Sequence, residues 1–112
     1  MKKIEIVVKP EKVGIVQLVL KECNVGGVME SKISGHGNQH GENFNFHGIM
    51  GTESNLSKVK IETVIPDEKE ERIINELLDA LPTGEIGDGK IFTYDVEDAI
   101  RIRTGEKGEN AL

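Results

Sequence analysis

Apolar residues recur along the chain with two different periods, and the changes of period define six predicted elements. A β-rich run with charges between its members, as at Ile4, Ile6, Val7 and Val8, is typical of a strand. Spacing of three and four, as at Val16, Val19 and Leu20, is typical of an amphipathic helix. The predicted elements are, in order, a strand at residues 2–9, a helix at 11–23, strands at 28–35 and 58–66, a helix that follows Asp67, and a strand at 90–94.

Residues with strong positional preferences mark the ends of both helices. Pro10 suits a first helical turn, because its missing N–H needs no partner there. Asn24 and Gly26 end this helix. Asp67 is predicted to be the N-cap of the second helix, with Glu70 as its capping-box partner.

Residues 35–57 show no sustained period. This stretch is rich in glycine and asparagine and holds all three histidines, His36, His40 and His47. Loops this long within compact domains are usually functional or disordered, so we expect a long functional loop at about 36–57. Residues 101–103 are predicted to form one more extended piece, and the polar tail at about 104–112 is predicted to fray.

The order strand–helix–strand, twice over, predicts the ferredoxin-like βαββαβ fold of the α+β class, as a single domain over residues 1–112. Lys3-Ile4-Glu5 and Lys60-Ile61-Glu62 open the two halves as a weak internal repeat. In this fold both helices cover one face of a four-stranded sheet. The chain is too short to cover the other face, which we therefore expect to pack against further copies.

Composition restricts the class of function. The 112 residues carry a formal net charge of −6, and a sequence-independent nucleic-acid binder would need a basic surface instead. The single cysteine, Cys23, cannot form an intramolecular disulfide, and we interpret it as an inert thiol in the last turn of a helix. The apolar run after Met1 is too short for a signal peptide or a membrane span, so we expect a cytoplasmic protein without membrane insertion.

Arg101 and Arg103 are separated by a single residue, so on a strand both would point to the same face. Two adjacent guanidinium groups suit a phosphate or a pair of carboxylates. A surface ion pair with Glu97 or Asp98 is an equally good interpretation of these two residues alone.

The segment Thr83-Gly84-Glu85-Ile86-Gly87-Asp88-Gly89-Lys90 adds a glycine-rich turn with a cation at its edge. Glycines allow backbone N–H groups to approach a ligand closely. The turn precedes a strand rather than a helix, so it is not a Walker loop. Together with Arg101, Arg103 and Lys58, it favours a specific polyanion such as a nucleotide.

Residues 83–92 and 96–106 together resemble the C-terminal signature of the PII signal-transduction family, and residues 1–5, 35–39 and 58–62 resemble its other matching stretches. The resemblance runs nearly end to end. It implies a ferredoxin-like homotrimer that binds ATP or ADP in clefts between subunits. It also implies magnesium and 2-oxoglutarate as effectors, and a long T-loop that grips a partner, either a transporter such as an ammonium transporter or an enzyme of nitrogen metabolism.

The resemblance also implies roles for individual residues. Gln39 would be the magnesium ligand, and Lys58 would pair with a carboxylate of 2-oxoglutarate. The residues implied in nucleotide binding are Gly27, Met29, Glu62 and Val64 on the adenine and ribose side, Gly35, Gly37, Asn38 and Gln39 at the T-loop base, and Ile86, Gly87, Gly89, Lys90, Arg101 and Arg103 around the phosphates.

The T-loop itself departs from the family pattern. Asn38 stands where the family often has Arg, and Gly51 stands where many relatives have the uridylylated Tyr, so no uridylylation is expected. Candidate anchors for a partner are Phe44, Phe46, Ile49 and Met50. The alternative for the two phenylalanines is that they fold back onto the protein surface. The three histidines lack a carboxylate or cysteine cluster that would complete a metal site.

The sequence therefore favours a regulatory nucleotide sensor that controls a partner through its T-loop. Because it supplies neither a nucleophile–base pair nor a placed general base with an orienting partner, we do not expect an enzyme. The alternative is an adenylate-energy sensor that binds ADP and ATP but not 2-oxoglutarate and regulates a membrane transporter. A slow nucleotide hydrolase is the weaker rival.

Overall fold

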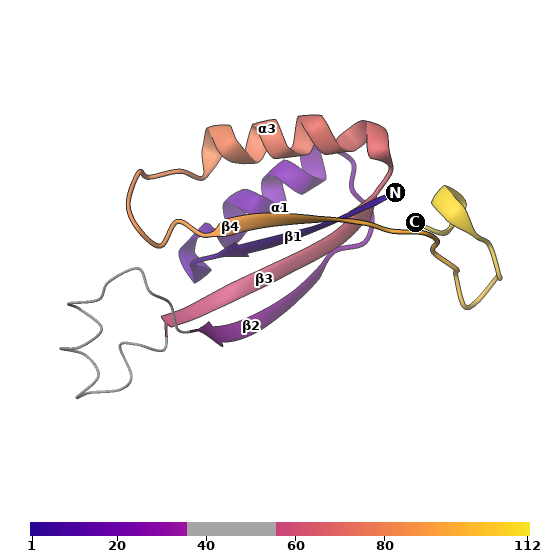
Figure 1. Ribbon diagram of the computed structural model, residues 1–112, viewed down its shortest axis with the longest axis horizontal. Coiled ribbons are helices and arrows are strands. Elements are labelled where there is room, and N and C mark those ends of the chain that lie inside the picture. The colour runs from indigo at the N-terminus through magenta and orange to yellow at the C-terminus, as the bar shows by residue number, and fades with distance from the viewer. Residues whose placement is uncertain (36–55) are drawn as a thin grey trace.

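The computed structural model describes residues 1–35 and 56–112, and within them the order of elements follows the prediction (Figure 1). The strands and helices are β1 (Lys2–Val8), α1 (Val13–Glu22), β2 (Met29–Gly35), β3 (Leu56–Ile65), α3 (Glu70–Ala80) and β4 (Lys90–Asp95). In the same described residues, 3-10 turns lie at Pro10–Lys12, Asp67–Lys69 and Gly108–Ala111. The predicted boundaries lie within about two residues of these, as expected for sequence-based boundaries.

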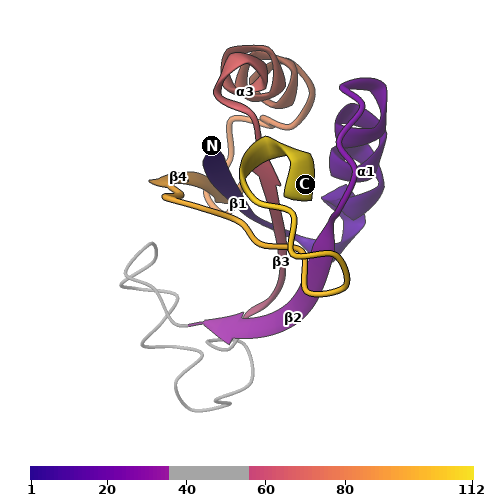
Figure 2. The same ribbon diagram turned by 90° about the vertical axis from the view of Figure 1, so that its right-hand side faces the viewer.

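The four strands form one sheet in the order β2-β3-β1-β4, and every neighbouring pair is antiparallel. Both helices lie on the same face of this sheet, side by side in two views (Figure 1, Figure 2). This arrangement confirms the predicted ferredoxin-like α+β fold. Because β3 lies between β1 and β2, the second half of the chain completes the sheet begun by the first.

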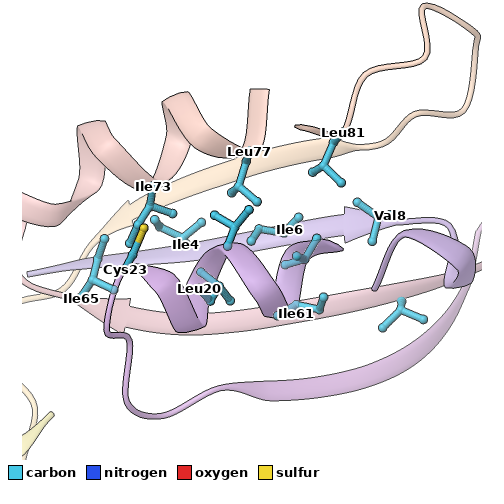
Figure 3. Close-up of a cluster of buried hydrophobic side chains, with 13 residues drawn as sticks. Ile4, Ile6, Val8, Leu20, Cys23, Ile61, Ile65, Ile73, Leu77 and Leu81 are labelled. Atoms are coloured by element: carbon cyan, nitrogen blue, oxygen red, sulfur yellow. The ribbon is translucent and has the colours of Figure 1, made fainter. Parts of the chain in front are cut away.

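The core lies between the sheet and the two helices (Figure 3). The inward positions of β1 and β3 alternate along each strand, as at Ile4 and Ile6. Ile73 and Leu77 of α3 are likewise fully buried, four residues apart on one face of the helix. Cys23 joins this cluster, and its burial raises the pKa of its thiol, in line with the predicted inert cysteine.

The opposite face of the sheet is open and carries a charged network. Glu5 of β1 stands directly opposite Glu62 of β3, a like-charge pair that would be unfavourable alone. The Lys3 ammonium lies 2.6 Å from Glu62 and 3.8 Å from Glu5, and it stacks 5.4 Å from the Tyr94 ring centre. The two halves of the predicted repeat are thus neighbours joined by one lysine.

The beginning of α3 differs from the prediction. Asp67 does not cap the helix: Pro66 introduces a 3-10 turn, and no side-chain hydrogen bond caps either the turn or α3. The Asp67 carboxylate instead lies 3.0 Å from the N-terminal ammonium of Met1. The predicted capping box with Glu70 is therefore wrong, because the Asp67 carboxylate pairs with the ammonium group of Met1, which is distant in the sequence.

The C-terminal segment also differs. Residues 101–103 do not form an extended piece, because a single bridge joins Ile100 to Lys107 and the chain between them turns back on itself. The tail does not fray but ends in the 3-10 turn at Gly108–Ala111. In the part of the chain that the structure describes, no helix has the length and apolar character needed to cross a bilayer.

Candidate functional site

The glycine-rich turn between α3 and β4 is closed by the side chain of Asp88. Its carboxylate accepts hydrogen bonds from the backbone N–H of Thr83 (2.8 Å), from the Thr83 hydroxyl (2.5 Å) and from the N–H of Gly84 (3.1 Å). These bonds, above all that of the Thr83 hydroxyl, hold the pKa of Asp88 below its ordinary value. Asp88 is therefore ionised at neutral pH and fixed to the start of the turn.

Gly89 is required where the turn enters β4. Its φ is +105°, and a Cβ built on it would lie 1.9 Å from the carbonyl oxygen of Val7. The turn thus passes against the backbone of β1 at a distance that only glycine permits. Lys90 follows as the first residue of β4, paired with Val7, and its side chain is exposed.

Lys58 connects β3 to the same turn. Its ammonium donates a hydrogen bond of 2.8 Å to the carbonyl oxygen of Gly87. Lys9 also lies beside Gly87. A Cβ placed on Gly87 would be 3.2 Å from Cε of Lys9 and 3.8 Å from Nζ of Lys58, so both side chains lie close to this glycine. Burial, together with the charge of Lys9, lowers the pKa of Lys58. An anion bound here would offset both effects.

The residues predicted for adenine and ribose gather at the other end of the sheet. Met29 of β2 is paired with Glu62 of β3, and Val64 follows two residues later on the same face. The carbonyl oxygen of Gly27 accepts a hydrogen bond of 2.5 Å from the hydroxyl of buried Thr63. Gly27, Met29 and Val64 line a hollow of about 560 Å³, which the C-terminal Ala111 and Leu112 also border.

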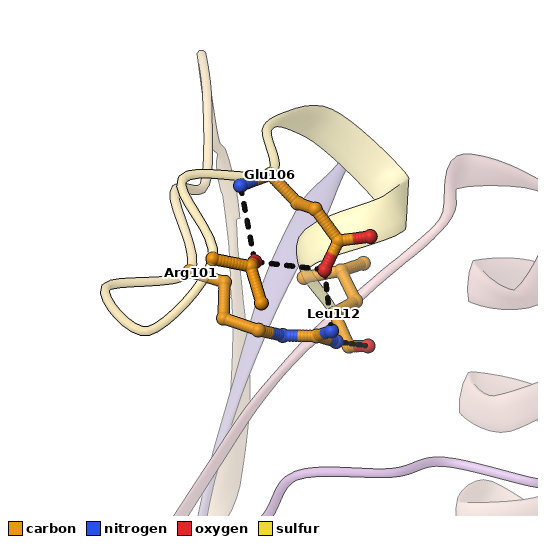
Figure 4. Close-up of polar contacts among 4 residues, drawn as sticks. Arg101, Glu106 and Leu112 are labelled. Carbon is orange, nitrogen blue, oxygen red and sulfur yellow. Dashed lines mark hydrogen bonds and ion pairs between the residues drawn. The ribbon is translucent and has the colours of Figure 1, made fainter.

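Arg101 lies at this second end and is already engaged. Its Nη1 lies 2.7 Å from the Glu106 carboxylate, and its Nη2 donates to the carbonyl oxygen of Leu112 at 3.3 Å (Figure 4). The partner is neither Glu97 nor Asp98, so that expectation is wrong. Asp98 instead accepts the N–H groups of Ala99 and Gly108 and thereby holds the tail.

The predicted phosphate ligands are therefore divided between the two ends of one chain. Val64 and Lys58 are six residues apart on β3, which is about 20 Å at roughly 3.3 Å per residue. The glycine-rich turn lies at the Lys58 end. The segment with Arg101 and Arg103 leaves β4 at the opposite end, where the N–H of Val96 donates to the carbonyl oxygen of Met1 (Figure 1).

Arg103 is exposed, and it lies in a turn rather than on a strand. The shared face predicted for the two arginines is therefore wrong. Both still belong to the same exposed hairpin, which follows β4. Together they can offer two cations at the Val64 end, but neither reaches the glycine-rich turn of its own chain.

Glu62 gives the Val64 end a pH dependence. The hydrogen bond from Lys3 holds the pKa of Glu62 below its ordinary value. Because the unfolded chain then binds the proton more readily, this contribution to stability is complete above the ordinary pKa. It is lost as the pH falls through the lowered one.

We expect Glu62→Gln to reduce the difference in urea midpoint between neutral pH and a pH below about 4. Glu71→Gln, on the exposed surface of α3, is the matched control and should leave that difference as it is in the parent protein. An unchanged difference in Glu62→Gln would contradict the assigned ion pair.

Several predicted residues lie outside the described residues, and their placement stays a prediction. They are Gly37, Asn38, Gln39, Phe44, Phe46, Ile49 and Met50, together with His36, His40 and His47. Gly35 is described as the last residue of β2, paired with Leu56 of β3, and so lies at the Lys58 end. Ile86, within the glycine-rich turn, is exposed.

Three residues near the site, Asp88, Thr63 and Lys9, were not predicted from the sequence. Asp88 lies within the glycine-rich turn, and its spacing of five from Thr83 is the signal that would have suggested a side-chain clasp. Thr63 alternates with buried residues of β3, so its hydroxyl was hidden in a core pattern. Only the pairing of strands brings Lys9 next to Lys58.

Comparisons with known proteins find relatives over the full length of the chain. The family described as Nitrogen regulatory protein P-II matches residues 1–106. A Nitrogen regulatory protein P-II of Rhodospirillum rubrum is 46% identical, and one of Haemophilus influenzae is 43% identical, in each case over the full length of both chains. A third, of Pyropia yezoensis, is 42% identical over the full length of both.

A match over almost all of the chain, with relatives this similar, also establishes the class of function. Members of the family are regulatory signal transducers rather than enzymes. The family resemblance stated for the sequence is thereby confirmed, and the chain belongs to the P-II family of nitrogen regulatory signal-transduction proteins.

Proposed function

We propose that this protein binds ADP or ATP in clefts between neighbouring copies of a homotrimer. One copy would supply the Val64 end, with Gly27, Met29 and Arg101. Its neighbour would supply the glycine-rich turn and the T-loop base. The single observation that supports this proposal is the division of the candidate ligands between two ends about 20 Å apart on one chain.

The two ends have complementary chemistry for a nucleotide. The Val64 end offers a partly apolar hollow beside the Gly27 backbone, which suits a base and a sugar. The other end offers backbone at positive φ in Gly87 and Gly89 and the cation of Lys90, which suits phosphates. In a trimer the open face of the sheet, with its Lys3–Glu62 network, would be covered by other copies.

We further propose that Mg-ATP recruits 2-oxoglutarate at the T-loop base. Gln39 would ligate magnesium through its carboxamide oxygen, an oxygen donor of the kind that this ion prefers. Lys58 would receive the distal carboxylate. Its partly buried ammonium, crowded by Lys9, gains a counter-charge when an anion binds, which favours this step.

The output is control of a partner in nitrogen metabolism, either a transporter or an enzyme, by the T-loop. Ordering of that loop by the ligands would change its grip on the partner. Phe44, Phe46, Ile49 and Met50 are the proposed anchors, and the setting is the cytoplasm. The alternative, an adenylate-energy sensor that ignores 2-oxoglutarate, retains the nucleotide cleft.

Calorimetry separates these proposals. We expect ADP and ATP to bind, and an absence of heat with both at millimolar concentration would contradict the nucleotide site. We then expect 2-oxoglutarate to bind to the Mg-ATP complex of the parent and not to that of Gln39→Ala. If neither protein gives heat with 2-oxoglutarate, binding of 2-oxoglutarate is rejected and the adenylate-energy sensor is the remaining proposal.

A further inference from the structure

We propose that Asp88 is a positioning residue, which fixes the glycine-rich turn for phosphate binding by clasping Thr83 and Gly84. The inference rests on the proposed nucleotide site and deepens it. Asp88 stands between Gly87 and Gly89, the two residues at positive φ that would face the phosphates. Its carboxylate would repel a phosphate if it faced one.

The geometry resolves this conflict. Both carboxylate oxygens are turned back to the start of the turn, where Oδ1 accepts the Thr83 hydroxyl and Oδ2 accepts the N–H groups of Thr83 and Gly84. Three donors within hydrogen-bond distance satisfy most of the acceptor capacity of the carboxylate. The negative charge therefore ties the turn to its own beginning instead of being offered to a ligand.

Two further contacts hold the second half of the turn, so the first half depends on the clasp by Asp88. At the far end Gly89 passes against the carbonyl oxygen of Val7, and in the middle the carbonyl oxygen of Gly87 accepts from Lys58. The first half begins at Thr83, after α3 has ended at Ala80. Glu85 and Ile86 are exposed, and the N–H of Glu85 donates to the Thr83 hydroxyl at 3.2 Å, so the clasp at Thr83 also holds this part of the turn.

The sign of the effect of a charge-neutral variant separates positioning from simple electrostatics. Removing a negative charge near a phosphate site strengthens phosphate binding if charge is all that matters. The carboxamide of Asn keeps only one acceptor oxygen and makes neutral rather than charge-assisted hydrogen bonds, so it holds the turn less firmly. Binding then weakens, because the ligand must order the turn itself. Asp88→Asn therefore gives opposite results under the two interpretations.

We expect Asp88→Asn to weaken ADP affinity by about tenfold, as loss of charge-assisted hydrogen bonds would. Thr83→Val removes the hydroxyl without changing any charge and should weaken ADP binding several-fold. Since both act through one clasp, the double variant should bind no more than about twofold more weakly than Asp88→Asn alone. Calorimetry with ADP measures all three on the full-length protein.

Asp79→Asn, the same exchange on the exposed surface of α3, is the matched control and should bind ADP like the parent. In Asp88→Asn the amide proton resonances of Thr83 and Gly84 should move, whereas the thermal midpoint of the ligand-free protein should stay near that of the parent. If Asp88→Asn does not fold, Thr83→Val alone carries the test, because its charge is unchanged.

The inference is overturned if Asp88→Asn or Thr83→Val binds ADP as tightly as the parent or more tightly. It is also overturned if the loss of affinity in the double variant equals the product of the two single losses. These outcomes differ from failure of the proposed function, in which the parent itself does not bind ADP.

Discussion

Alanine at Arg103 or Arg101 is expected to weaken ADP and ATP binding by about one to two orders of magnitude. Each guanidinium would make charge-assisted hydrogen bonds to phosphate, which contribute about 1.5–3 kcal/mol apiece. The loss should be smaller for Arg101, because it must first exchange Glu106 for the phosphate. Arg103 makes no ion pair within the described residues and has no such partner to give up.

Both arginine variants should fold like the parent, since they change the exposed hairpin outside the core. Arg72→Ala is the matched control. It removes an exposed arginine that pairs with Glu76 on α3, and it should leave nucleotide binding unchanged. Calorimetry with a parallel urea titration checks both expectations. Unaltered affinity in both arginine variants would show that the hairpin is not part of the cleft.

Replacement of Gly89 by alanine is expected to lower the free energy of unfolding by roughly 2–4 kcal/mol, a large effect for one methyl group. The new Cβ would lie 1.9 Å from the carbonyl oxygen of Val7, which belongs to the central strand β1 and cannot move freely. The positive φ adds backbone strain to this clash. Nucleotide binding should be lost as well, because Lys90 would shift with the turn.

Gly84→Ala separates strain from clash. Gly84 also has a positive φ, +84°, but a Cβ there meets no atom within 4 Å. Its replacement should therefore lower the free energy of unfolding by only about 1 kcal/mol. Urea denaturation of the two variants measures the difference, and equal losses would contradict the close approach to Val7.

The elements could be predicted from the sequence, because they depend on local periodicity. The spacing of Val16, Val19 and Leu20, for example, corresponds to the buried face of α1. Predictions failed where a side chain had competing partners. Asp67 has the chemistry of an N-cap, but the ammonium of Met1 reaches it through the folding of β1 beside β3.

The C-terminal predictions failed for a related reason. Alternating Arg101 and Arg103 fit a strand, but the bonds of Arg101 to Glu106 close a short hairpin between residues five apart in the sequence. Polar residues at a chain end suggest fraying, yet Asp98 binds the N–H of Gly108 and so fixes the tail. The secondary-structure preferences of the individual residues do not predict these hydrogen bonds.

The candidate site was predicted as a set of residues but not as a geometry. Cations and glycines could be counted along the chain, whereas their distribution over two ends of the sheet depends on strand order and register. Lys58 approaches Gly87 only because β3 pairs with β1 and β1 with β4. The same pairing keeps Arg101 away from Lys90, which is why a second copy of the chain enters the proposed site.

Co-assembly of two defective chains tests the shared cleft most directly. Arg103→Ala alters the Val64 end, and Lys90→Ala alters the glycine-rich turn, so each homotrimer should bind ADP weakly. In trimers formed by co-expression of both chains, random assortment places the two intact ends together in about a quarter of the clefts. We predict that ADP titration of the mixture reveals this fraction of sites with parental affinity. If the mixed trimers bind ADP no better than the two single-variant homotrimers, the whole site lies within one chain and the account is contradicted.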